Sequence, residues 1–120
     1  MSIELKTKYG QIDISNEVIA TVAGGAAIDC YGIVGMASKN QIKDGLTEIL
    51  RKENFSRGVI VRQEDETIYI DMYIIVSYGT KISEVAHNVQ TKVKYTLDQT
   101  VGLAVDSVNI FVQGVRVANS

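Results

Sequence analysis

His87 is the only histidine in the chain and the first candidate for acid–base chemistry. It falls on a predicted helix over residues 83–99, away from the apolar stripe formed by Val85, Val89 and Val93. A catalytic histidine needs an orienting carboxylate and a nucleophile within hydrogen-bond reach, and no such arrangement can be recognised in this sequence. We therefore expect a solvent-exposed histidine on a face shared with Thr91, Lys94 and Asp98.

Cys30 is the only cysteine, so no disulfide can form within the chain. It falls on the apolar side of the first predicted helix, where a free cysteine usually behaves as a small buried hydrophobe rather than as a reactive thiolate. The sequence start, MSIELK, lacks the basic and apolar order of a secretory signal. Together these features predict a cytoplasmic protein in a reducing compartment.

The carboxylates are scattered and match neither a calcium-loop nor a zinc-ligand spacing. The glycine pairs match neither a phosphate loop nor a dinucleotide-binding fingerprint. The sequence therefore predicts no catalytic residues, no metal and no cofactor, and we expect that the protein is not an enzyme.

The hydrophobic periodicity predicts an alternation of strands and helices along the chain. Strands are predicted at 9–14, 57–62, 67–78 and 104–117, and helices at 18–30, 41–52 and 83–99. Ser15 or Asn16 is expected to cap the first helix, and Gly24 and Gly25 within it suggest the close approach of a neighbouring backbone. The order predicts an α+β fold, a two-layer sandwich with helices on one face of a mostly antiparallel sheet of about four strands.

Length and charge narrow the possible partners. With 120 residues and no proline or linker-like segment, the chain is predicted to form a single domain over residues 1–120. The net charge of −2 disfavours nucleic acid and anionic lipid as general partners. No apolar run reaches the roughly 18 residues of a spanning helix, so any membrane association is expected to be indirect, through a partner.

Five blocks of sequence carry a family resemblance: IDISNEVIA (12–20), YGIVGM (31–36), DMYIIVSYG (71–79), EVAHNVQ (84–90) and VNIFVQGV (108–115). Together they resemble the alkaline shock protein family of Gram-positive bacteria, especially its short YloU-like envelope stress members. The resemblance implies a link to cell-envelope stress and supplies no active site. It also implies relatives that are held near the membrane by a separate anchoring partner.

The remaining feature is the second face of the longest predicted strand. If Ile68 to Val76 alternate toward the helices, another set of side chains projects from the opposite side of the sheet, namely Tyr69, Tyr73, Ile75 and Phe111. Helices are predicted for only one layer, so this aromatic surface is expected to serve self-association or a protein partner, unless a helix or the N-terminal segment covers it. The alternative function is binding of single-stranded RNA by stacking on these rings, although the acidic character of the chain argues against it.

Overall fold

The computed structural model describes residues 2–37 and 56–117 of the chain. In sequence order the elements are β1 (Ser2–Thr7), β2 (Gly10–Ser15), α1 (Asn16–Ile28), β3 (Ile33–Met36), β4 (Val59–Glu64), β5 (Thr67–Ser77), α2 (Ile82–Thr96), a π-helical turn η3 (Leu97–Val101) and β6 (Ser107–Arg116). The helix predicted at 41–52 lies outside the described residues.

Strand β5 forms the centre of a four-stranded sheet. β4 pairs antiparallel with its first half and β3 antiparallel with its second half, while β6 runs parallel along nearly its whole length. Because β6 occupies one edge of β5 over residues 69–77, β3 and β4 share the other edge. The prediction of an α+β fold with a mostly antiparallel sheet of about four strands is confirmed.

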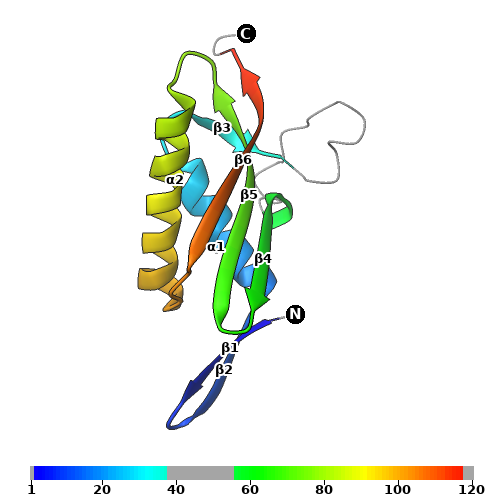
Figure 1. Ribbon diagram of the computed structural model, residues 1–120, viewed down its shortest axis with the longest axis vertical. Helices are drawn as coiled ribbons and strands as arrows, with labels where there is room; N and C mark the ends of the chain where they lie inside the picture. Colours follow the sequence, from blue (N-terminus) through cyan, green and yellow to red (C-terminus); the bar gives the residue numbers. More distant parts are fainter. Residues whose placement is uncertain (1, 38–55, 118–120) are drawn as a thin grey trace.

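The two helices lie together on one side of this sheet (Figure 1). Every second residue of β5 points toward them and is buried, and the set comprises Ile68, Ile70, Met72, Ile74 and Val76. From the helices, Ile19 and Ala23 of α1 and Val85, Val89 and Val93 of α2 complete the same core. The alternation of β5 and the three-to-four-residue spacing of the helices thus meet in a single apolar layer.

The N-terminal strands differ from the expectation. The strand predicted at 9–14 corresponds to β2, but it pairs with β1 in a separate two-stranded sheet instead of joining the main sheet. β1 was not predicted, although Ile3 and Leu5 alternate with Glu4 and Lys6 in the pattern of a half-exposed strand. In Figure 1 this hairpin, drawn in dark blue, extends beyond the helices and the main sheet.

Helix α1 begins as expected, because the Ser15 hydroxyl accepts a hydrogen bond of 3.2 Å from the backbone N–H of Val18. The expected close approach at Gly25 is wrong, since a Cβ atom placed there would meet no neighbouring atom within 4 Å. Gly32, in the turn after α1, is a position where the fold does require glycine. Its φ is +89°, and a Cβ atom would lie 2.7 Å from a methyl group of Val85.

Candidate interaction surface on the outer face of the sheet

The side of the main sheet that faces away from α1 and α2 combines aromatic and charged side chains. In the register of the sheet, Arg62 lies opposite Tyr69, Asp71 lies between Ile60 and Asn109, and Tyr73 lies opposite Phe111. Side chains directly opposite one another on neighbouring strands share a face. We call this surface the outer face and define it by Ile60, Arg62, Tyr69, Asp71, Tyr73, Ile75, Asn109 and Phe111.

Asp71 is the polar centre of the outer face. Its carboxylate accepts hydrogen bonds from Nε of Arg62 at 2.8 Å, from Nη2 of Arg62 at 3.2 Å and from Nδ2 of Asn109 at 2.9 Å. Only 9% of the residue is exposed, and a carboxylate so placed requires this kind of pairing. The network joins β4, β5 and β6 and fixes the direction of each side chain.

Arg62 is held at the edge of this network. Nη1 of Arg62 lies 3.4 Å from a carboxylate oxygen of Glu64. The hydrogen bonds with the Asp71 carboxylate are the largest of several influences that raise the pKa of Arg62 above its ordinary value. The guanidinium is therefore a fixed positive charge whose main partners already lie within the protein.

The aromatic part of the outer face flanks the carboxylate on both sides. The rings of Tyr73 and Phe111 stack with centroids 5.0 Å apart and an interplanar angle of 18°. On the other side, the guanidinium carbon of Arg62 lies 4.8 Å from the centroid of the Tyr69 ring, a cation–π geometry. Aromatic rings and charged groups therefore alternate across the outer face and contact one another.

The four residues predicted for an interaction surface do share this face, but they differ in exposure. Phe111 is 40% exposed and Tyr69 is partly buried, whereas Tyr73 is 8% exposed and Ile75 is fully buried. Among the described residues, Ala37 and Ile60 pack with Tyr73 and Ile75 in a second, small apolar cluster. The expectation of an open surface therefore needs correction for Tyr73 and Ile75, which form its floor, and only Tyr69 and Phe111 are available at its surface.

Sequence reasoning missed Arg62 and Asn109 as members of the site. Asp71 could be placed between the two tyrosines from the two-residue period of β5 alone. The strand register brings in the other two, since Asn109 is 38 positions away from Asp71 in the chain. No local pattern at Arg62 or Asn109 indicates that they would meet one carboxylate.

The two side chains considered for nucleophilic chemistry lie elsewhere. His87 is exposed on α2, as expected. Cys30 is partly buried against the main core, and its thiol donates a weak hydrogen bond of 3.6 Å to the carbonyl of Ala26. Burial is the main cause that raises the pKa of the Cys30 thiol, so the thiolate is disfavoured at neutral pH.

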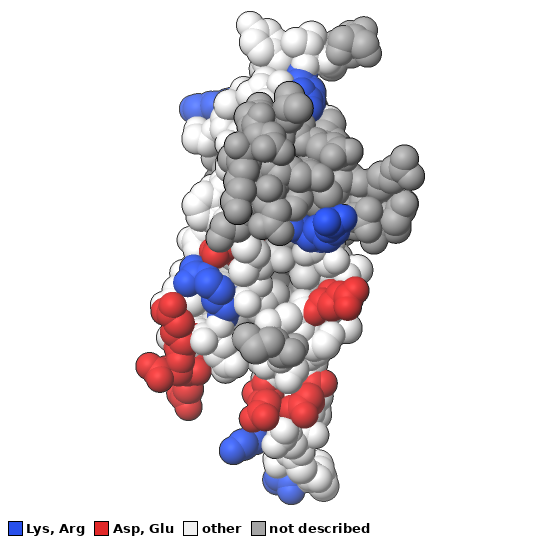
Figure 2. Space-filling model, turned by 90° about the vertical axis from the view of Figure 1, so that its right-hand side faces the viewer, with Lys and Arg blue, Asp and Glu red and all other residues white. Residues whose placement is uncertain are grey.

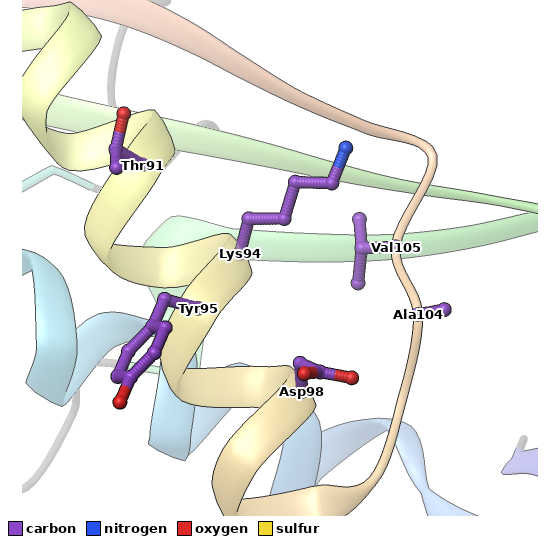
Figure 3. Close-up of a pocket in the computed structure, with 6 residues that line it drawn as sticks. All are labelled: Thr91, Lys94, Tyr95, Asp98, Ala104 and Val105. Atoms are coloured by element: carbon purple, nitrogen blue, oxygen red, sulfur yellow. The ribbon is translucent and has the colours of Figure 1, made fainter.

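A hollow on the helical side is lined by α2, the η3 turn and the following connection (Figure 3). Its lining residues are Thr91, Lys94, Tyr95, Asp98, Ala104 and Val105. Figure 3 shows the Lys94 side chain extending toward Val105, while the Tyr95 ring points away on the other side of the helix. One amine and one carboxylate beside apolar walls, without a nucleophile and base in contact, form no recognisable catalytic arrangement.

Within residues 2–37 and 56–117, no three His, Cys, Asp or Glu side chains are grouped so as to hold a metal ion. In the same part of the chain, no helix has both the length and the apolar character that crossing a membrane demands.

These features define an α+β fold in which α1 and α2 cover one face of a sheet and a mixed aromatic and charged surface lies on the other. Residues 4–117 match the sequence model of the alkaline shock protein 23 family, a family described as having a cell envelope-related function. The chain belongs to this family, as the resemblance of the five sequence blocks predicted.

Among individual relatives, the chain is 90% identical to the uncharacterized protein YloU of Bacillus subtilis (strain 168), over 99% of each chain. It is 49% identical to the uncharacterized protein Spy1614 of Streptococcus pyogenes serotype M6, over 98% of this chain and 97% of that one. Among solved structures, the zinc form of a variant of the MamM CTD is similar, with a TM-score of 0.50, 13% identity and coverage of 87% and 90% of the two chains. At this identity the similarity concerns the fold alone.

Proposed function

We propose that this protein is a non-catalytic interaction or scaffold protein in cell-envelope homeostasis, and that it binds a protein partner through the outer face of its sheet. The observation that carries the proposal is the Asp71 network beside the two accessible rings. A carboxylate held by three hydrogen bonds, with a stacked aromatic pair next to it, is a rigid surface that is already organised for binding.

The composition of the outer face suits a protein partner. Aromatic side chains and arginine are the residue types that contribute most often to the energetic centres of protein interfaces. Phe111 and Tyr69 offer partly exposed rings, and buried Tyr73 and Ile75 support them from below. A partner that places an apolar side chain against Phe111 would bury that ring without disturbing the fold.

The same surface is a poor match for single-stranded RNA, the alternative function. Stacking of bases is usually combined with free positive charge that follows the nucleic acid backbone. At the outer face, the centre is a carboxylate, and the guanidinium of Arg62 is engaged by Asp71 and Glu64. The net charge of −2 adds no general attraction.

The proposal is tested by crosslinking in cells that produce the protein, followed by capture of the full chain. The wild type is compared with a Tyr69→Ser and Phe111→Ser double variant and with a control variant, Tyr95→Ser. Tyr95 is 64% exposed on α2, so the control removes an exposed ring outside the outer face. We expect a specific protein that is recovered with the wild type and the control but lost with the double variant, and recovery that resists nuclease treatment.

Thermal unfolding of all three proteins controls for folding. Equal recovery of the partner by a folded double variant would contradict the proposal, and nuclease-sensitive recovery would favour the RNA alternative.

A further inference from the structure

The β1–β2 hairpin, which we call the arm, is an element without a core of its own. Within the described residues, β1 and β2 pair only with each other. Figure 1 shows the arm extending away from the body, and the molecule measures 54 Å along its longest axis against 27 and 24 Å across. A two-stranded hairpin alone is at best marginally stable in water, so an arm of this kind gains from a further strand.

The two faces of the arm have opposite character. On one face, Ile3 lies opposite Ile14 and Leu5 lies opposite Ile12. Ile3, at the base, is 2% exposed and belongs to the main core, whereas Ile12, nearer the tip, is 50% exposed. The apolar face is thus covered at its base and loses its cover toward the tip.

The other face carries charges in an alternating order along β1. Glu4 lies opposite Asp13, and Lys6 lies opposite Gln11. The amide of Gln11 donates hydrogen bonds to Asp13 at 2.8 Å and to Glu4 at 3.3 Å, which relieves part of the repulsion between the two carboxylates. Glu4 and Lys6 therefore lie two residues apart on one face of one strand, on either side of Leu5.

A groove lies over the charged face of β1. It is lined by Ser2, Glu4 and Lys6 of β1, by Gln63 of β4 and by Glu66 of the β4–β5 turn. Figure 2 shows this end of the molecule, where basic side chains lie at the tip of the arm and a group of acidic ones lies above them. Carboxylates in the groove and lysines near the tip are complementary charges on one surface.

We propose that the edge of β1 away from β2 pairs with β1 of a second copy of this chain, so that two arms join into one four-stranded antiparallel sheet. Antiparallel pairing centred on Leu5 places Glu4 opposite the partner's Lys6, and Lys6 opposite the partner's Glu4. A two-fold axis makes both pairs at once, as isologous association requires. Opposite charges directly across a strand pair are stabilising, and like charges there are destabilising.

The same pairing extends the apolar face. Leu5 meets the partner's Leu5 at the axis, and Ile12 lies one strand further out in each copy. Four strands with a shared apolar face exceed the three that independent stability of a sheet requires. The association uses β1 and not the outer face, so it is independent of the proposed partner binding.

The test is sedimentation equilibrium of the full chain at low ionic strength. The variants are Glu4→Lys, Lys6→Glu and the double exchange of both. Lys92→Glu, on the exposed side of α2, is a control with the same charge change as Lys6→Glu. Each single variant places like charges opposite each other twice. We therefore expect the dissociation constant of the dimer to rise by about tenfold or more. The double exchange restores opposite charges and should return the constant to within about threefold of the wild type.

Restoration by the double exchange is specific to association between identical β1 strands. If the protein remains monomeric at every accessible concentration, the proposal is overturned. The role of Lys6 would then be to protect the edge of β1 from pairing with other chains. Association that survives both single variants, or that the double exchange does not restore, would also overturn it. Thermal unfolding of each variant shows whether the arm is still folded, and Phe111→Ser should leave the dissociation constant unchanged.

Discussion

The two faces of strand β5 belong to one continuous stretch of chain but are built on different principles. Toward the helices the strand presents only aliphatic side chains and methionine, all within one large core. On the outer face it presents two tyrosines, an isoleucine and a paired carboxylate, and among the described residues Ala37 and Ile60 pack with Tyr73 and Ile75 in a small apolar cluster. The inner side presents no charged side chain from β5, whereas the outer face holds the Asp71 carboxylate by giving it partners.

The difference separates the face that stabilises the fold from the face that we propose for binding. The inner face supplies the apolar burial that folding requires. The outer face combines a supported floor with accessible rings at its surface, an arrangement that suits recognition better than it suits a core.

The sharpest comparison uses two neighbouring isoleucines that are both fully buried, Ile74 on the inner face and Ile75 on the outer face. We expect Ile74→Ala to destabilise the protein by about 4 kcal/mol, because it opens a cavity in the large core. Ile75→Ala should cost about 2 kcal/mol, because the cluster that the described residues form around it is smaller than the main core. Chemical denaturation measures both, and a larger loss at Ile75 than at Ile74 would reverse the assigned roles of the two faces.

Asp71 tests whether the outer face depends on its charge network. Asp71→Ala removes the acceptor shared by Arg62 and Asn109, and we expect a loss of about 1–3 kcal/mol in the free energy of unfolding. Asp98→Ala, an exposed carboxylate on the η3 turn, is the control and should stay within about 0.5 kcal/mol of the wild type. If the two variants were equally stable, the Asp71 network would make no contribution to the stability of the fold.

Phe111 tests how far the exposed rings take part in stability. Its stack with Tyr73 predicts a loss of about 0.5–1.5 kcal/mol for Phe111→Ser, well below that at either isoleucine. Thermal unfolding beside Tyr95→Ser provides the comparison. Unfolding of the Phe111 variant at room temperature would mean that the outer face is a second core and not a binding surface.

The smallest effect concerns Cys30 on the inner side. The pKa of the Cys30 thiol is raised in the folded protein, so the protonated thiol contributes to the stability of the folded state. This contribution is fully present below the pKa of the unfolded thiol, about 8.5, and is lost as the pH rises through the pKa of the folded state. The wild type should therefore lose some stability above that pH, and Cys30→Ala should lose less. Unfolding temperatures between neutral and alkaline pH measure this, and identical profiles would show that the burial of the thiol carries no such coupling.

Much of this comparison could be predicted from the sequence. The strict alternation of β5 identified both faces, and the spacing in the helices identified the side that they cover. The capping hydroxyl of Ser15 and the exposure of His87 also followed from local pattern.

The rest depended on long-range pairing that local patterns do not encode. The parallel position of β6 brings Asn109 and Phe111 to β5, and only the register of β4 brings Arg62 to Asp71. The burial of Tyr73 and Ile75 could not be read from their alternation, because a period of two assigns a face but not what lies over it. β1 had the alternation of a strand and was missed because six residues at a chain end are a short signal.

Partner binding through the outer face is tested most directly by placing a photo-crosslinking side chain at single positions in the living cell. We predict that position 111, on the outer face, yields one discrete adduct with another protein, and that position 95, on α2, does not. Adding Tyr69→Ser to the protein with the crosslinker at position 111 should reduce that adduct. A discrete adduct from position 95 and none from position 111, in proteins that unfold at the same temperature, would contradict the account.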